Sequence, residues 1–411
     1  MTPVELSRTV LRAVRRAVEG GELRVVVPET ASVTVPGAGG CGDYATNIAL
    51  QLARPAGETP RRVAELLRPH LAGAHGVSGV EITGPGFLNI SLGSTASTAL
   101  VEEILRRGPQ YGFVDDQAAD ARHGVLPPGQ AAPTARHGDL PPGQDAPTTR
   151  LVRLHAPNEP RALVVMDVVA RLLRSQGTPV RTRCDSRPEP AWSALLGAEI
   201  EADAYGSPEA PAQRDADADA DADADAVAVT GADVHVNVRP VPAPDPADLH
   251  PLGRDAARWA LLHPAAHDRP RLTADHLAQR ESNPLFRVRY AYARTRAVSR
   301  NAADLGFTAA PGDVRQDVQQ DVLEDTAPLL THLADHPRLL ARAAAHRAPD
   351  LLARHLVAVA DATLALLPAT LPLGDEKPSA AHRARLALAE AAGAVLAGGL
   401  SLLGIDAPEH L

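Results

Sequence analysis

The segment "HAPNEPRALVVMDVVARLLRSQG" (His155–Gly177) decides the fold in the middle of this 411-residue chain. The strand-like stretch "LVRLHAP" (151–157) leads into it, and apolar residues then recur at helical spacing up to Gly177, a residue type common after helix ends. In such a strand–helix unit, the connecting turn usually carries glycines and polar groups that bind phosphate. Here the turn reads only "APNEPR". The sequence therefore predicts the strand and helix of a nucleotide-binding unit without the residues that would bind the phosphate. We interpret His155 as a residue at the end of the strand.

The length of the chain indicates two or three domains, because single hydrophobic cores stop growing near about 250–300 residues. A hydrophobic fraction of 45% is sufficient for large cores, while aromatic residues make up only 3% of the chain. The cores must therefore consist mostly of leucine, valine and alanine. Each of the few aromatic residues is correspondingly informative.

Charge and cysteine content restrict the class of protein. The net charge is −9, but the tract "DADADADADAD" (215–225) holds six of the acids, so the remainder carries only −3. Because local patches govern binding more than totals do, this balance does not exclude RNA. Cys41 and Cys184 are too far apart in sequence for a multi-cysteine zinc site. We expect a cytoplasmic protein with no metal, no DNA partner and no membrane partner.

The N-terminal residues predict an amphipathic helix, with Leu6, Val10, Val14 and Val18 on one side. It has no uninterrupted apolar stretch, so we interpret it as neither a signal peptide nor a membrane span. A basic amphipathic helix can also lie on a membrane surface. We expect this one to cap the domain behind it.

Low-complexity segments divide the chain into structured blocks. We predict an α/β N-terminal domain, a truncated Rossmann-like α/β middle domain, and an all-α C-terminal helical bundle. A Pro/Gly-rich linker with a duplicated 14-residue unit separates the first two, and the Asp-Ala tract at 215–226 is predicted to be disordered. The expected boundaries are 1–107, 108–150 for the linker, 151–240 and 241–411.

Several motifs, in the right order, carry a family resemblance. "GCGDYATNIALQLAR" (Gly40–Arg54) and "VEITGPGFLNISL" (Val80–Leu92) resemble the N-terminal additional domain of arginyl-tRNA synthetases. "GRDAARWALL" (Gly253–Leu262) is similar to the Asp-Ala-x-Arg element of that family's DALR anticodon-binding domain, and "ESNPLFRVRYAYARTRAVSR" (Glu281–Arg300) is similar to the helix that follows it. The resemblance implies a tRNA partner, with arginine tRNA expected.

The two catalytic signatures of that family are missing. The family's His-x-Gly-His motif belongs at the "APNEPR" turn, and it occurs nowhere in this chain. Its Lys-Met-Ser-Lys loop would precede "DAARWALL", where the chain reads "RPVPAPDPADLHPLG" (239–253) and has no lysine; the single lysine is Lys377. Adenylation depends on positive charge preorganised around the reacting phosphate. We therefore expect no catalytic residue, no ATP binding and no cofactor.

The resemblance assigns tRNA contacts in the first block to the strand "GPGFLNI". Phe87 would stack on an exposed base of the tRNA elbow and Asn89 would hydrogen-bond its edge, a common way of recognising unpaired RNA bases. The structural alternative is that Phe87 is a core aromatic on a half-buried strand.

A second set of contacts is expected on the segment 280–300, which carries six arginines and one acid. Arginines that hold phosphates, interleaved with aromatics that stack on bases, are typical of proteins that bind a single-stranded loop. The residues assigned to the anticodon are Asn283, Arg287, Arg289, Tyr290 and Arg294. The alternative is a solvated face of a bundle helix, with Tyr290 packed inward.

Three functional hypotheses follow. The first is a non-catalytic protein that binds or carries tRNA. The second is residual or partner-assisted arginine–tRNA ligase activity, or a tRNA-dependent transferase acting with a tRNA-using enzyme. The third is a protein-interaction scaffold that has lost RNA binding.

Overall fold

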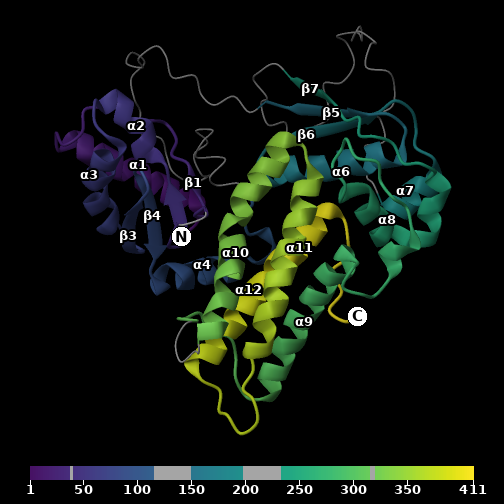
Figure 1. The fold of residues 1–411 in the computed structure, drawn as a ribbon. Helices are drawn as coiled ribbons and strands as arrows, with labels where there is room; N and C mark the ends of the chain where they lie inside the picture. Colours follow the sequence, from purple (N-terminus) through teal and green to yellow (C-terminus); the bar gives the residue numbers. More distant parts are fainter. Residues whose placement is uncertain (38–39, 115–149, 198–232, 315–319) are drawn as a thin grey trace, which may run out of the picture.

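The structure is a computed structural model that describes residues 1–37, 40–114, 150–197, 233–314 and 320–411. Two α/β parts lie on either side of a long helical bundle (Figure 1). The order along the chain agrees with the predicted one: an α/β unit, a parallel sheet and an all-α bundle. The duplicated linker unit (121–148) and the Asp-Ala tract (215–226) lie outside the described residues.

The N-terminal unit is built on a four-stranded antiparallel sheet of order β1-β2-β4-β3. Helices α1 and α3 pack together, and α3 also packs on β3 and β4. Its elements are α1 (Pro3–Glu19), β1 (Val33–Thr34), β2 (Tyr44–Thr46), α2 (Ile48–Ala56), α3 (Pro60–Ala72), β3 (Val77–Thr83) and β4 (Phe87–Leu92).

Helix α1 begins with a capping box, in which the Thr2 hydroxyl accepts from the Glu5 N–H and the Glu5 carboxylate accepts from the Thr2 N–H. Leu6, Val10 and Val14 are fully buried in the N-terminal core. This confirms the expectation that the helix caps the domain behind it.

Helix α4 (Ser94–Arg107) and the short helix η1 (Gly108–Gln110) continue the chain away from this unit. Leu100, Val101 and Ile104 pack in the larger core shared with the bundle, where α4 and η1 lie against the last helix. If the boundary is defined by which core the side chains pack in, the N-terminal unit ends near residue 93. The boundary predicted from the sequence is at 107.

The middle of the chain forms a three-stranded parallel sheet of order β6-β5-β7. The predicted strand "LVRLHAP" corresponds to β5, and β7 falls on the apolar run "VHVNV" (234–238). The elements are β5 (Val152–Ala156), α6 (Pro160–Ser175), β6 (Val180–Cys184), α7 (Pro190–Leu196) and β7 (Val234–Asn237). The predicted helix is α6, and Gly177 just beyond its end has a φ of +73°.

Helix α6 has buried apolar side chains on nearly all of its faces, because other elements of the protein surround it. It packs on β5 and β6 and also on the bundle helices α8, α10, α11 and α12. The sheet and the bundle consequently share one hydrophobic core. Residues 151–240 and 241–411, which we expected to be separate domains, thus do not have separate hydrophobic cores.

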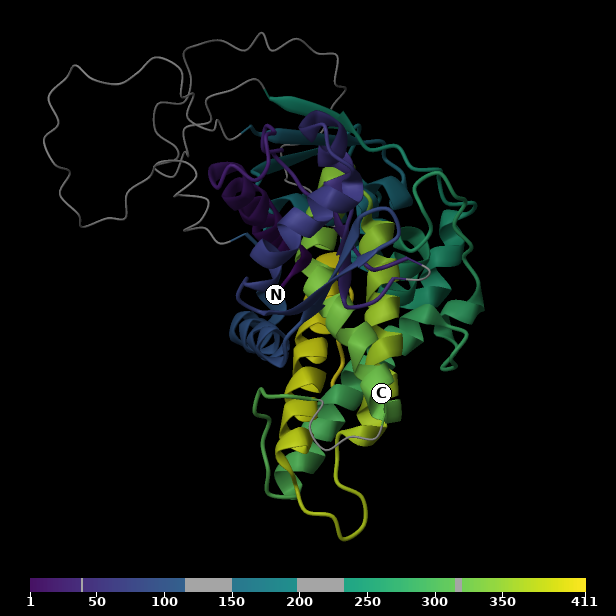
Figure 2. The same ribbon diagram turned by 60° about the vertical axis from the view of Figure 1, so that its left-hand side comes forward.

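The long helices of the bundle extend away from both α/β parts (Figure 2). Its elements are η2 (Pro246–Leu252), α8 (Gly253–Leu262), η3 (Ala274–Leu277), α9 (Pro284–Asp304), α10 (Gln320–His346), α11 (Pro349–Leu366), η4 (Leu367–Ala369) and α12 (Ala380–Leu403). By length and composition alone, 349–369 and α12 could each cross a membrane. Here 50% and 78% of their apolar windows are buried against the protein, which accounts for that composition.

Candidate nucleic-acid interface

Asn283, one of the predicted anticodon contacts, is the N-cap of α9. Its Oδ1 accepts from the Leu285 N–H at 3.1 Å, and its amide donates to the carbonyls of His276 and Ala278, both at 2.9 Å. The residue is only 4% exposed. Both amide N–H groups are thus used inside the protein, so Asn283 fixes the start of α9 and does not present an amide to a base.

Arg287 and Arg289 also have partners within the protein. Arg287 Nη1 lies 3.1 Å from Asp361 Oδ1, and Arg289 Nη1 lies 3.4 Å from Asp255 Oδ2. Burial raises the pKa of Asp255, and the guanidinium of Arg289 opposes that shift. Phosphate binding at either arginine would compete with an existing ion pair.

The other arginines of the segment are neutralised in the same way, with one exception. Arg280 pairs with Asp275 at 2.6 Å, while Arg296 and Arg300 share Glu409 at 3.2 and 3.8 Å. The strongly basic surface expected from the local count of charges is therefore wrong. Carboxylates from distant positions in the sequence offset most of it.

The exception is Arg294. It follows Phe286 and Tyr290 at intervals of four residues, so the three side chains lie along one face of α9. Tyr290 is 36% exposed, its ring stacks on Phe286 with centroids 5.4 Å apart, and the guanidinium of Arg294 lies 5.9 Å from its ring centroid. Tyr290 therefore does not pack inward, which contradicts the structural alternative. An exposed tyrosine ring, backed by the partly buried Phe286 and beside a cation, is suited to stacking an unpaired base. Sequence reasoning missed Phe286, although its i, i+4 spacing to Tyr290 signals the contact.

Of the two residues predicted to contact the tRNA elbow, Phe87 is exposed and Asn89 is buried. Phe87 begins β4 after the turn Gly84–Gly86, in which both glycines have positive φ, and the Gly86 backbone lies against Pro60. Phe87 is 40% exposed and outside the core, so the core alternative is wrong. Asn89 is 2% exposed and donates to the Thr83 hydroxyl at 2.7 Å, so it does not reach the surface.

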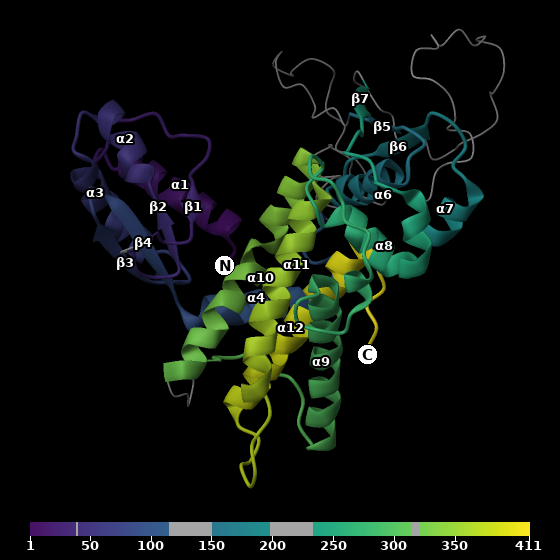
Figure 3. The same ribbon diagram turned by 45° about the vertical axis from the view of Figure 1, so that its right-hand side comes forward.

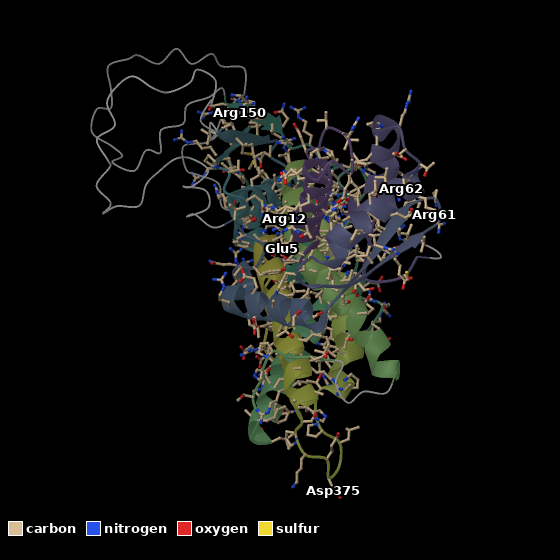
Figure 4. The ribbon with its side chains drawn as sticks, turned by 90° about the vertical axis from the view of Figure 1, so that its left-hand side faces the viewer. Glu5, Arg12, Arg61, Arg62, Arg150 and Asp375 are labelled. Atoms are coloured by element: carbon tan, nitrogen blue, oxygen red, sulfur yellow. The ribbon has the colours of Figure 1, made fainter. Side chains whose placement is uncertain are left out.

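A third basic surface, which sequence reasoning treated only as a capping helix, lies on α1. Four of its arginines are exposed: Arg8, Arg12, Arg15 and Arg16. Figure 4 shows Arg12 beside Glu5 in the middle of the left-hand side of the molecule. The signal was present in the sequence as arginines on the face opposite Leu6 and Val10.

The N-terminus of α6, at the turn where the resemblance expects a nucleotide, is closed by the protein itself. The Glu159 carboxylate accepts from the Ala162 N–H at 2.8 Å and from the Ala243 N–H at 3.0 Å. Helix N-termini attract anions because their first N–H groups are unpaired and the helix dipole is positive there. Here a carboxylate of the chain already occupies that position.

Arg161, two residues after Glu159, reinforces the closure. It is fully buried, and its guanidinium donates to five backbone carbonyls at 2.6–3.1 Å. The carbonyls belong to Val241, Leu261, Pro264, Ala265 and Asp268. Residues 162–165, which follow inside α6, are all apolar and buried. The start of α6 is therefore tied to the segment before α8 and to the loop after it.

Comparison with known proteins identifies both ends of the chain. Residues 5–92 match the arginyl tRNA synthetase N-terminal domain, and residues 288–411 match the DALR anticodon binding domain. An arginine–tRNA ligase of Renibacterium salmoninarum is 28% identical over the full length of both chains. That alignment runs over 560 positions, 149 more than this chain has residues. An arginine–tRNA ligase of Frankia alni is 45% identical over 112 residues, which are 27% of this chain and 20% of that one.

Solved structures agree at the level of the fold. The arginyl-tRNA synthetase of Thermus thermophilus superposes with a TM-score of 0.60 at 15% identity, covering all of both chains. The enzyme of Plasmodium falciparum gives 0.63 at 10% identity, covering all of this chain and 99% of that one. The chain is thus similar to the arginyl-tRNA synthetases: its two ends match their N-terminal domain and their DALR anticodon binding domain, and it shares their fold.

Proposed function

We propose that this protein binds tRNA, with arginine tRNA as its partner, and does not itself activate arginine with ATP. The observation that carries the proposal is the closed N-terminus of α6. There the Glu159 carboxylate accepts from the Ala162 N–H and places negative charge where a phosphate would bind, and Arg161 holds the covering segments in position.

The chemistry of the sequence supports the loss of catalysis. The four residues 162–165 offer no imidazole and no glycine, and the stretch 239–253 offers no lysine. Stabilising the charge on a reacting phosphate is commonly the largest contribution to such catalysis. Without donors or cations aimed at that position, ATP would be neither held nor activated.

The exposed aromatic residues support tRNA binding. The N-terminal unit, which carries Phe87, and helix α9, which carries the Phe286–Tyr290 pair, lie on either side of α10–α12 (Figure 3). Two stacking sites on elements separated in this way suit a long, folded RNA with unpaired loops at two places. The elbow and the anticodon of a tRNA are such loops.

Two measurements on the purified full-length chain test the proposal. ATP–pyrophosphate exchange with arginine and tRNA should stay at background, and exchange well above background would contradict the loss of catalysis. Incubation with total tRNA, followed by sequencing of the retained RNA, should enrich arginine tRNAs. If no tRNA is retained even at low salt, the binding function is wrong.

One specific observation favours a second candidate, in which a partner protein completes a tRNA-dependent enzyme. Parallel sheets are normally covered on both faces. In this sheet α6 covers one face, and Arg181, Arg183 and His235 are exposed on the other, where no described element packs. Ligase activity that appears only when cell extract is added would favour this candidate over a simple carrier.

A further inference from the structure

The exposed face of α1 concentrates positive charge, and Glu5 is the acid nearest to its arginines. Residues 8–16 contain four arginines and no acid, and the apolar side chains between them point into the core. Arg8, Arg12 and Arg16 recur every four residues, so they follow one face of the helix over about 12 Å. Arg15 lies next to this row.

The α1 arginines differ from those of α9 in their partners. None of the four forms an ion pair with a described carboxylate, and Arg12 makes only a hydrogen bond of 3.1 Å to the Thr9 hydroxyl. In the segment 280–300, which includes most of α9, five of the six arginines are already paired. A phosphate that approaches α1 therefore meets free guanidinium groups, whereas on most of α9 it must displace a carboxylate.

A cavity of about 520 Å³ opens beside this row, between α1, the end of α3 and the start of α4. Arg12 and Arg16 line it from α1, and His70 and His75 line it from the opposite side. The acid in its wall is Glu5, whose carboxylate accepts from the Thr2 N–H at 2.7 Å. Its volume lies within the range of small-ligand sites, which is large enough for one nucleotide unit.

We propose that α1 is the main phosphate-binding surface of this protein, and that the cavity takes one phosphate-bearing unit of an RNA backbone between Arg12 and Arg16. The proposal rests on the proposed tRNA binding and adds where the RNA backbone is held. A lone small anion would use only the cavity. Arg8 and Arg15 do not line that cavity, so the basic row is longer than one phosphate and fits a chain of them.

The test compares two double variants for tRNA binding as a function of salt concentration. Arg12→Gln/Arg16→Gln removes two cations that lack acidic partners. Arg296→Gln/Arg300→Gln removes two equally exposed arginines that share Glu409. All four side chains are exposed, so both variants should keep the far-UV circular dichroism spectrum and urea midpoint of the parent chain.

The slope of log K against log salt reports how many phosphates are neutralised. Its magnitude should fall by about 0.7 to 0.9 for each phosphate that the α1 variant no longer neutralises, and it should be unchanged in the α9 control. Equal slopes in the parent and the α1 variant, or a larger change in the control, would overturn the proposal. Complete displacement of the RNA by millimolar AMP or inorganic phosphate would show that a small anion in the cavity accounts for all the binding, and would also overturn the proposal.

Three results separate this inference from the proposed function. If arginine tRNA is retained but the α1 variant binds it unchanged, the α1 surface is wrong and the function stands. If RNA binds through Arg12 and Arg16 with no preference for arginine tRNA, the α1 surface stands and the assigned partner is wrong. If no RNA binds, or only an acidic protein does, both are wrong.

Discussion

At the scale of single residues, two fully buried arginines hold the middle of the molecule together. Arg161 donates to five carbonyls, and Arg258 donates to Asp167 Oδ2 at 2.6 Å and to the carbonyls of Leu196 and Leu403. Burying a guanidinium is costly unless its N–H groups find partners, and its planar fork allows several at once. Both residues therefore act as structural cross-links between segments far apart in sequence.

Arg161→Met should strongly destabilise the fold, because it leaves buried carbonyls without donors. Loss of a partner from a buried charged network typically costs about 3–5 kcal/mol. Urea unfolding followed by circular dichroism measures the change. Arg181→Met, at an exposed arginine with no described partner, is the matched control and should change stability by less than about 0.5 kcal/mol. Similar stabilities for the two variants would show that the Arg161 hydrogen bonds contribute little.

Tyr290→Ala should weaken tRNA binding by about 1–3 kcal/mol, the usual contribution of one aromatic–base stack. Tyr290→Phe keeps the ring on Phe286 and should bind as the parent does. Fluorescence anisotropy with labelled tRNA compares the three proteins at one salt concentration. Unchanged binding by the alanine variant would exclude Tyr290 from the interface.

At the scale of elements, α10 and α11 share a buried cluster of histidines. The rings of His336 and His355 stack with centroids 5.2 Å apart, His332 meets His355 edge-on at 6.1 Å, and Tyr111 stacks on His336 at 6.0 Å. Burial lowers the pKa of His336 to about 4, and burial together with the neighbouring histidines keeps the pKa of His355 well below its usual value. These histidines are neutral in the folded protein near pH 7.

Stability should therefore fall as the pH drops from about 6.5 toward about 4. In that window the unfolded chain takes up protons on these histidines and the folded chain does not, which favours unfolding. For His336 alone, the shift from 6.5 to about 4 corresponds to roughly 3 kcal/mol. Urea midpoints across this pH range measure the slope.

His336→Phe should flatten this pH dependence while keeping a ring between Tyr111 and His355. His267→Phe, at a highly exposed histidine, is the control and should leave the slope unchanged. If His336→Phe has the same acid sensitivity as the parent, another group is responsible.

At the scale of the whole molecule, two separate cores explain how the parts are joined. The N-terminal core is formed within residues 6–90, whereas the parallel sheet, α4 and the bundle share the second core. One contact between them is Arg338 of α10, which donates to the Val33 carbonyl at 3.1 Å. The N-terminal unit is thus packed mainly on itself.

A fragment of residues 1–92 should accordingly fold alone, because it contains its core and all four strands of its sheet. We expect a cooperative thermal transition. A fragment of residues 150–240 should not fold, since α6 needs the bundle to cover it. Non-cooperative unfolding of 1–92, or a cooperative transition in 150–240, would contradict this division.

The sequence by itself determined the order and type of the elements, and it predicted the loss of two catalytic motifs. Strand and helix periods are local, so β5, α6, β7 and the bundle helices could be predicted from residues close together in the chain. The aromatic residues Phe87 and Tyr290 could be proposed for the same reason: each lies in a recognisable local motif.

Only the tertiary structure decided which of these side chains are available. Asn89 and Asn283 are buried in hydrogen bonds to other parts of the chain, and five arginines at 280–300 meet acids from other elements. The α1 arginines, in contrast, form no ion pair with a described acid, although Glu5 lies beside Arg12. Electrostatic and hydrogen-bond partners are chosen by distance in space, and distances between remote segments are set only when the helices and sheets pack.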